Sequence, residues 1–192
     1  MILPIVAYGN PVLRKVAEEI EPDYPGLKEL ISNMWETLYA SNGVGLAAPQ
    51  INRPIRLFLV DSEQVFENME DEEERNQYPG DKGAKKVFIN AYVKALDGKP
   101  WAYNEGCLSI PKVREDILRP QSVTIEYEDE NFQFHTETYT GLTARIILHE
   151  YDHIEGKLFI DHLPLLKKKL LKRKLSDITS GKVKVDYKMS FS

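Results

Sequence analysis

The feature that most constrains this chain is the sequence His149-Glu150-Tyr151-Asp152-His153, in which two histidines stand four residues apart. In an α-helix, residues i and i+4 lie one turn apart on the same face, so both imidazole rings face one point. Glu150 would lie about 100° around the helix, within reach of a water molecule on an ion held by the two rings. If the motif holds an ion, the fold must turn the histidine face of this helix toward a further ligand.

The residues around this motif favour a helix. From Thr140, a candidate N-cap, apolar residues and the two histidines recur at helical spacing, and Gly156 stands where a helix would end. Two other interpretations remain open at this point: surface histidines, or hydrogen-bonded histidines in the core. A catalytic divalent ion needs at least three protein ligands, so the interpretation as a metal site requires a third ligand.

That third ligand has candidates on both sides of the motif. Downstream, Glu155 follows His153 too closely to join it, and His162 comes later. Upstream, Cys107 is the only cysteine of the chain, and it follows a strand-like segment with Gly106 at its elbow. A thiolate with two imidazoles would leave a fourth position open for water. A lone cysteine is most often a small buried apolar side chain, so the residues alone leave the choice open.

The order of the expected elements indicates an α+β fold, with antiparallel or mixed β-sheets packed around the central helix that carries the motif. The spacing of apolar residues predicts helices over 10–18, 26–41, 140–155 and 163–178. Strands are predicted over 54–61, 87–96, 100–103, 122–128, 132–139 and 183–187, those at 122–128 and 132–139 forming a hairpin. The uncharged, glycine-rich stretch 43–50 is predicted to form no regular element.

The length of 192 residues predicts one domain over residues 1–192. Within it, residues 62–86 contain five consecutive acidic residues and two Gly-containing turns, and are expected to form an acidic surface insertion. The apolar N-terminus lacks a basic leader and a cleavage site, and no run approaches the roughly 18 apolar residues of a membrane span. A cytoplasmic location without membrane contact is therefore expected.

Charge is unevenly distributed along the chain. Residues 163–192 hold nine basic and two acidic residues, a net charge of +7, whereas residues 1–162 hold 16 basic and 28 acidic residues, or −12. This balance argues against DNA as a partner of the whole chain and leaves a local contact with nucleic acid open for the basic C-terminal segment. One interpretation of that segment is a helix docked by its leucines, with a solvated cationic face.

Three blocks of the sequence resemble the peptide deformylase family. They are Gly43-Val44-Gly45-Leu46-Ala47-Ala48-Pro49-Gln50, then Glu105-Gly106-Cys107-Leu108-Ser109, then His149-Glu150-Tyr151-Asp152-His153, and they occur in the family's order at compatible spacing. The segments 11–14 and 110–114 are also similar, so the resemblance covers roughly residues 1–160. It implies a metal-dependent hydrolase that acts co-translationally in protein biosynthesis, removing the formyl group from the N-formylmethionine of nascent polypeptides and releasing formate.

By this resemblance, Cys107, His149 and His153 bind one divalent metal ion. The family characteristically uses Fe²⁺, and Zn²⁺, Ni²⁺ or Co²⁺ can occupy the site; softness and geometry alone would have favoured zinc. Metal-bound hydroxide would attack the formyl carbon, with Glu150 acting first as general base and then as general acid. The side-chain amide of Gln50 and the backbone N–H of Leu108 are the matching donors to the developing oxyanion.

The outer positions of the site concern the substrate. Gly43 and Gly45 fit a backbone that passes close to an extended N-terminal peptide, which could add as a strand to this edge. Further candidates for substrate binding are Val44, Gly106, Arg114 and Leu142, with Val44, Leu142 and the His149 ring walling a methionine pocket. Glu105 would orient the Cys107 loop or a metal ligand, or else be a surface carboxylate. Arg145 is either a solvated charge on the helix face or a residue at the pocket rim.

Three further hypotheses follow from the same residues. The basic C-terminal segment could contact ribosomal RNA near the exit of the nascent chain, with which the family's C-terminal extension is associated. An endopeptidase of the zincin type is one rival, disfavoured because no third His or Glu follows His153 at a usable spacing. A non-catalytic, ribosome-associated binding module is the other, disfavoured because all three ligands and Glu150 are present.

Overall fold

A five-stranded antiparallel sheet forms the main layer of the computed structural model, which describes residues 1–191. Its strands lie in the order β2-β3-β4-β7-β8, with β2 at one edge. Their bounds are Gly45–Ala47 (β2), Leu57–Asp61 (β3), Lys85–Asp97 (β4), Ser122–Glu128 (β7) and Phe134–Thr140 (β8). The predicted hairpin is confirmed, because β7 and β8 pair antiparallel from Ser122 opposite Thr140 to Glu128 opposite Phe134.

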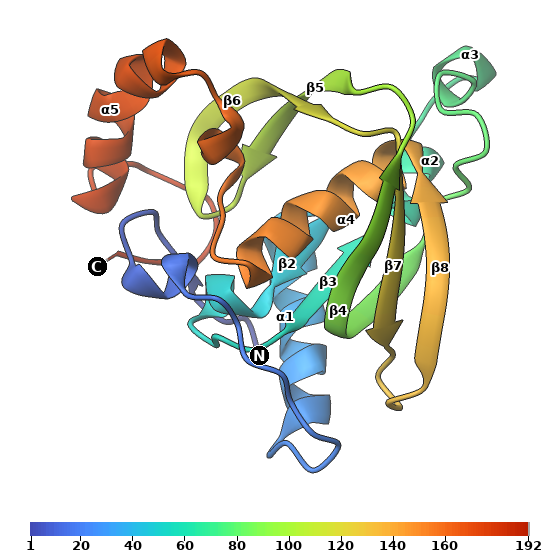
Figure 1. The fold of residues 1–192 in the computed structure, drawn as a ribbon. Coiled ribbons are helices and arrows are strands. Elements are labelled where there is room, and N and C mark those ends of the chain that lie inside the picture. The colour runs from blue at the N-terminus through green and yellow to red at the C-terminus, as the bar shows by residue number, and fades with distance from the viewer. Residues whose placement is uncertain (192) are drawn as a thin grey trace.

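The helix α4 (Gly141–Ile154) lies at the centre of the molecule, packed on β2 and β3 (Figure 1). A separate two-stranded sheet of β5 (Trp101–Cys107) and β6 (Ile110–Arg119) lies on its other side. Buried apolar residues of α4 join the core with Phe58, Phe88 and Ile125 of the sheet. The predicted α+β class, with sheets around a central helix, is therefore confirmed.

A second part of the core lies under α1 (Leu27–Ala40), which matches the helix predicted over 26–41. Its buried face includes Leu27, Ile31, Met34 and Leu38, which pack with Leu57 and Leu59 of β3. Apolar residues recurring every three or four positions form one helix face, which is why local spacing located this helix.

The N-terminus of α4 is fixed by a remote segment. Thr140 is the N-cap position, as expected, yet its hydroxyl bonds the carbonyl of Gln121 and makes no capping bond. Asp81 instead accepts from the backbone N–H of Thr143 at 2.8 Å and from its hydroxyl at 2.6 Å. A carboxylate at a helix N-terminus satisfies an otherwise free N–H and interacts favourably with the helix dipole.

Asp81 belongs to the segment 62–86, whose description as a surface insertion needs correction. The acidic run of this segment, residues 70–74, is exposed. The segment as a whole contains two short helices, α2 (Glu63–Glu67) and α3 (Glu72–Arg75). Met69 is buried, and Asp81 contacts the central helix. This segment is therefore partly built into the fold, because Met69 is buried and Asp81 accepts hydrogen bonds at the N-terminus of α4.

Three other predictions of local structure are wrong, and one strand was not predicted. Residues 43–50 contain β2, which pairs with β3, and the start of a 3-10 helix, Ala48–Ile51. The strand that was not predicted is β6, residues 110–119. The first helix is only a 3-10 turn, Pro11–Arg14. The last strand is β9 (Met189–Ser190) rather than 183–187, and it pairs in parallel with β1 (Ile5–Val6).

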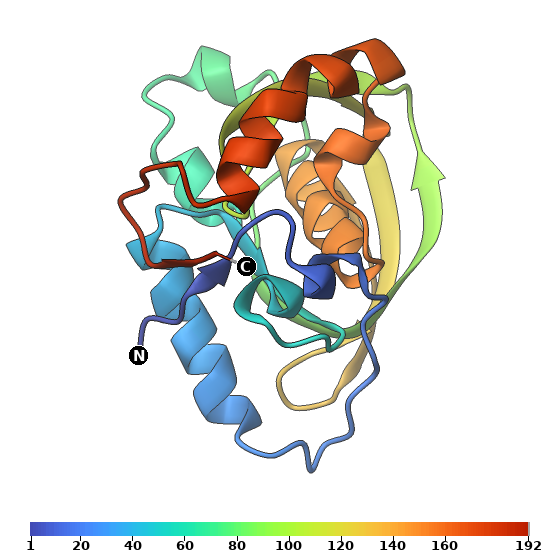
Figure 2. The same cartoon turned by 90° about the vertical axis from the view of Figure 1, so that its left-hand side faces the viewer.

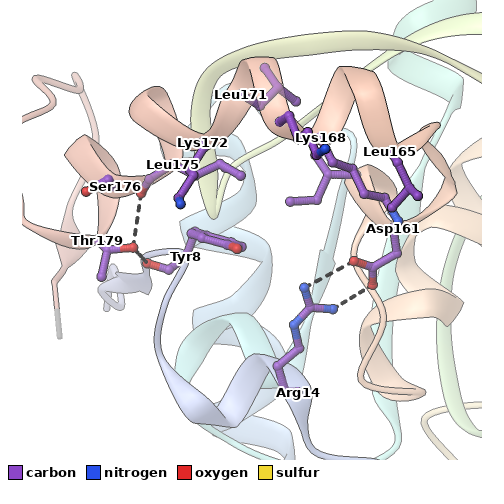
Figure 3. A pocket seen from close by; sticks show the side chains of 12 residues that line it. Tyr8, Arg14, Asp161, Leu165, Lys168, Leu171, Lys172, Leu175, Ser176 and Thr179 are labelled. Carbon is purple, nitrogen blue, oxygen red and sulfur yellow. Dashed lines mark hydrogen bonds and ion pairs between the residues drawn. The ribbon is translucent and has the colours of Figure 1, made fainter.

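The helix α5 (Leu165–Thr179) packs against β6 and against the N-terminal segment, where the Thr179 hydroxyl donates to the carbonyl of Tyr8 at 3.2 Å (Figure 2). Only part of its leucine content is used for docking: Leu171 is buried, whereas Leu166 and Leu170 are 70% and 73% exposed. A groove of about 480 Å³ is lined by residues of α5 on one side and by Tyr8 and the Arg14–Asp161 ion pair on the other (Figure 3). Among residues 1–191, no helix is both long and apolar enough to cross a membrane.

Candidate metal centre

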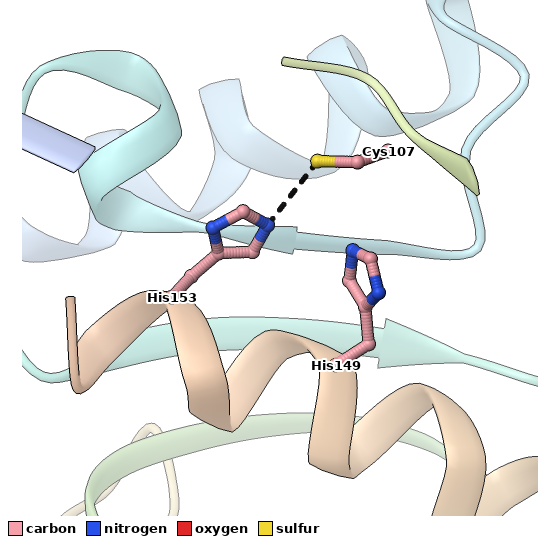
Figure 4. A group of neighbouring side chains, drawn as sticks. All are labelled: Cys107, His149 and His153. Atoms are coloured by element: carbon pink, nitrogen blue, oxygen red, sulfur yellow. Dashed lines mark hydrogen bonds between the residues drawn. The ribbon is translucent and has the colours of Figure 1, made fainter. Parts of the chain in front are cut away.

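The side chains of Cys107, His149 and His153 converge on one point (Figure 4). One ligand atom of each lies within 4.8 Å of the others, and the Cys107 Sγ is 3.4 Å from Nε2 of His153. Tetrahedral coordination with bonds of 2.0–2.3 Å places neighbouring ligand atoms about 3.6 Å apart. The three predicted ligands thus have a spacing that fits one ion.

Two separate elements bring these ligands together. Both histidines lie on α4, one turn apart, whereas Cys107 is the last residue of β5. The β5–β6 register shifts between Gly106 and Cys107, so that Cys107 lies opposite Ile110 across a tight connection. This irregularity ends the strand beside the helix, which places the thiol next to the two rings.

Glu105 fixes the orientation of the first histidine. Its Oε2 is 2.9 Å from Nδ1 of His149, which leaves Nε2 of that ring for an ion. Burial alone raises the pKa of Glu105, but hydrogen bonds from His149 and Arg119 outweigh burial and hold that pKa well below its usual value. Glu105 is 4% exposed, so the interpretation as a surface carboxylate is wrong.

Glu150 is buried beside the glycine-rich edge strand. A methyl group added at Gly45 would lie 2.8 Å from both Cγ and Cδ of Glu150, so only glycine leaves room for this side chain. Its Oε2 is buried, and among the described residues it has no hydrogen-bond partner. Burial raises the pKa of Glu150 to about 7. Such a carboxyl can accept and return a proton near neutral pH.

Gln50 approaches the thiol of Cys107 with its side-chain amide. Its Oε1 accepts from the N–H of Ala47 at 2.9 Å, which directs its Nε2 toward Cys107 Sγ at 3.6 Å and Ser109 Oγ at 3.3 Å. Because the carbonyl oxygen is held by the backbone, the amide can only present N–H donors to the site. Ser109 was not predicted, and nothing in its local pattern distinguishes it from a turn residue.

The remaining predicted residues lie on β5, β6 and α4 and in the loops next to β2 and β5. Leu108 lies in the β5–β6 connection, and its carbonyl accepts from the hydroxyl of Tyr187 at 2.7 Å. Val44 is 37% exposed beside the edge strand, and Leu142 is buried on α4, two turns before His149. The guanidinium of Arg114 bonds Asn104 and lies over Gly106, where an added methyl would be 2.7 Å from Nη1.

The burial of Arg145 contradicts both interpretations given for this residue. It is 2% exposed, so it is neither a solvated charge nor a rim residue. Its Nη1 donates to Glu105 Oε1 at 2.8 Å. Arg119, which was not predicted, donates to both oxygens of the same carboxylate. One signal could have indicated the inward direction of Arg145: it precedes His149 by four residues and therefore shares its helix face.

A family model described as polypeptide deformylase matches residues 2–169. The chain belongs to the peptide deformylase family. The peptide deformylase of Christiangramia forsetii is 55% identical over 191 residues, which cover 100% of this chain and 96% of that protein. The peptide deformylase of Flavobacterium psychrophilum is 54% identical over 189 residues, which cover 98% and 96%. The family resemblance of the three sequence blocks is thereby confirmed.

Solved structures agree with this assignment. A peptide deformylase from Legionella pneumophila has a TM-score of 0.78 and 31% identity, covering 95% of this chain and 98% of its own. Peptide deformylase 1B of Arabidopsis thaliana in complex with an inhibitor has a TM-score of 0.78 and 30% identity, covering 94% and 92%. Family membership excludes the zincin endopeptidase as an interpretation of this chain.

Proposed function

We propose that this chain removes the N-formyl group from the N-terminal formylmethionine of nascent polypeptides with an ion at Cys107, His149 and His153 and with Glu150 as proton carrier. The activity itself follows from the family: peptide deformylases are hydrolases that deformylate nascent peptides. The observation that carries the proposed mechanism is the buried, unpartnered Oε2 of Glu150 next to three converging ligand atoms.

Cys107, His149 and His153 would hold the ion through Sγ and two ring nitrogens. A bound divalent ion supplies Lewis-acid chemistry, which polarises a carbonyl and lowers the pKa of water. We propose Fe²⁺ as the resident ion, from the family resemblance, with Zn²⁺, Ni²⁺ and Co²⁺ as alternatives. The mixed thiolate and imidazole donor set is compatible with each of these borderline ions.

Glu150 would move the proton. In this proposal its carboxylate takes a proton from the attacking water as the bond from oxygen to the formyl carbon forms. It then gives that proton to the methionine nitrogen as the carbon–nitrogen bond breaks, so that formate and a free amine leave. Burial supports both halves of the role, because the raised pKa makes the carboxylate basic enough to accept and acidic enough to return the proton.

Gln50 and the backbone N–H of Leu108 would stabilise the charge that develops on the formyl oxygen. The fixed amide of Gln50 supports this role, because an oriented donor needs no reorganisation during the reaction. Removing one such donor typically costs about 3 kcal/mol of transition-state stabilisation. Glu105 would keep the His149 ring in the orientation that ligation needs.

The peptide would bind along the free edge of β2. This edge is open because β2 is the outermost strand of its sheet, and an extended peptide can add to it by main-chain hydrogen bonds. Val44, Gly45 and Leu142 would contact the methionine end. We propose that Gly106 and Arg114 contact the following residues, since Arg114 is exposed and lies over Gly106.

Formate release from the peptide formyl-Met-Ala-Ser tests this function. Glu150→Ala should retain its metal and lose activity, since the proton carrier is absent while the three ligands remain. Full turnover by this variant would refute the proposed mechanism. Absence of formate release from anaerobically purified, iron-loaded protein would refute the activity and favour the non-catalytic binding module.

We also propose that α5 contacts ribosomal RNA, which would place the enzyme in the cytoplasm where nascent chains emerge. The support is the exposed cationic surface of α5, which includes Lys169, Arg173 and Lys174. Contacts with phosphates make such binding steeply dependent on salt. Deleting residues 163–192 should abolish co-sedimentation with ribosomes at low salt, and unchanged co-sedimentation would refute this contact.

A further inference from the structure

Arg145 joins the two elements that carry the metal ligands. Its guanidinium donates to Glu105 Oε1 at 2.8 Å, to the carbonyl of Ile117 at 2.9 Å and to that of Trp101 at 2.7 Å. Glu105 and Trp101 lie on β5, Ile117 lies on β6, and Arg145 itself lies on α4. One buried side chain thus joins α4, which carries His149, to the sheet of β5 and β6, in which β5 ends at Cys107.

The hydrogen bonds to Glu105 leave its carboxylate one orientation. Arg119 donates Nε to Oε1 at 2.7 Å and Nη2 to Oε2 at 3.1 Å. Arg145 adds a second donor to Oε1, and His149 takes the remaining position on Oε2 at 2.9 Å. A carboxylate accepts about four hydrogen bonds, so all four positions are filled. Without Arg145, Oε1 of Glu105 would keep only one of these two donors, Nε of Arg119.

Aromatic rings lie next to the Arg145 guanidinium, and both Arg145 and Glu105 are buried. The Arg145 guanidinium lies 4.5 Å from the ring centre of Trp101 and 5.7 Å from that of Tyr103. Tyr78, from the segment 62–86, packs on Trp101 with the ring centres 5.9 Å apart. Exclusion of water strengthens charge-assisted hydrogen bonds. The surroundings therefore favour a fixed position of the guanidinium.

We propose that Arg145 is a positioning residue for the metal centre, which holds Glu105, and through it the His149 ring, at a fixed place relative to Cys107. It touches neither substrate nor ion in this role. The inference rests on the proposed metal centre and deepens it. Groups that orient a metal-ligating histidine typically change metal affinity by 10–100-fold when they are removed. Because Arg145 acts through Glu105, we expect the lower end of that range.

Co²⁺ binding to the full chain tests this role. Affinity is measured by competition with a chelator, thiolate coordination by the visible absorption of the bound Co²⁺, and stability by thermal unfolding. We expect Arg145→Met to bind Co²⁺ about 10-fold more weakly. Arg145→Lys should lose less affinity, since its ammonium group can still donate to Glu105 but cannot reach all three acceptors.

Arg56→Met is the matched control. Arg56 is also a buried arginine that pairs with an acidic residue near α4, Glu155, at 2.7 Å, yet it does not contact Glu105. It should lose thermal stability and keep wild-type Co²⁺ affinity and spectrum. Equal affinity of Arg145→Met, Arg145→Lys and wild type, or equal weakening by Arg56→Met, would overturn the role of Arg145. Failure of the wild type itself to bind Co²⁺ would instead refute the metal centre.

Discussion

Replacing Gly45 by alanine tests whether the position of the Glu150 carboxylate determines the rate. Gly45 does not adopt a left-handed backbone conformation, so alanine brings no backbone strain. Its new methyl group would lie 2.8 Å from Cγ and Cδ of Glu150, whereas carbon atoms in contact normally lie about 3.5–4.0 Å apart. The Glu150 side chain must therefore move by about 1 Å.

The expected size of the effect follows from this displacement. A misplacement of about 1 Å in an active site can cost 100-fold in rate, and each tenfold loss corresponds to about 1.36 kcal/mol. We therefore expect kcat to fall about 100-fold, or about 2.7 kcal/mol. The metal content should not change, because the methyl group is directed at Glu150 and the three ligands stay in place.

The assay compares formate release and metal content of Gly45→Ala with those of Gly43→Ala. Gly43 belongs to the same stretch, but a methyl group added there would meet the end of the flexible Leu108 side chain at 3.0 Å. We expect less than a tenfold loss of kcat for this control. A rate of Gly45→Ala equal to that of Gly43→Ala, with full metal content in both, would refute the reasoning.

Three further predictions concern other parts of the molecule. Glu150→Gln should keep the metal and lose about 100- to 10,000-fold in kcat, and a rate near wild type in the formate assay would contradict it. Gln50→Ala should lower kcat about 100-fold with one metal ion retained, which metal analysis and the same assay check. Burial raises the pKa of Glu137, but hydrogen bonds from Tyr127, Tyr139 and Lys86 outweigh it and leave that pKa lowered. Its carboxylate therefore stabilises the fold above the usual pKa of about 4.3, and this contribution is lost as the pH falls through the lowered value. Thermal unfolding should show Glu137→Gln to be less stable than wild type at pH 7, with the difference shrinking below about pH 4; a constant difference would contradict this.

Local patterns predicted the elements that depend on near neighbours. The helix of His149 and His153 follows from spacing and from Gly156, which has a left-handed φ of 68° just after the helix ends. The β7–β8 hairpin follows from two strand-like runs joined by a short polar turn. In contrast, β9 pairs with β1 across most of the chain, and such a remote partner leaves no local pattern.

The candidate site shows the same division. Two ligands and Glu150 follow from the helix period, whereas Cys107 required the family resemblance, because a lone cysteine usually packs as an apolar side chain. The buried positions of Arg119 and Arg145 could not be predicted from composition, because charged residues are almost never fully buried unless they are paired. Their partner Glu105 becomes their neighbour only in the folded chain.

Metal analysis of the anaerobically purified wild type and Cys107→Ala, combined with formate release from formyl-Met-Ala-Ser, tests the central claim most directly. A metal centre at Cys107, His149 and His153 predicts one divalent ion per wild-type chain and formate release. It predicts that Cys107→Ala, although folded, loses both the ion and the activity. Formate release at the wild-type rate by metal-free Cys107→Ala would contradict the claim.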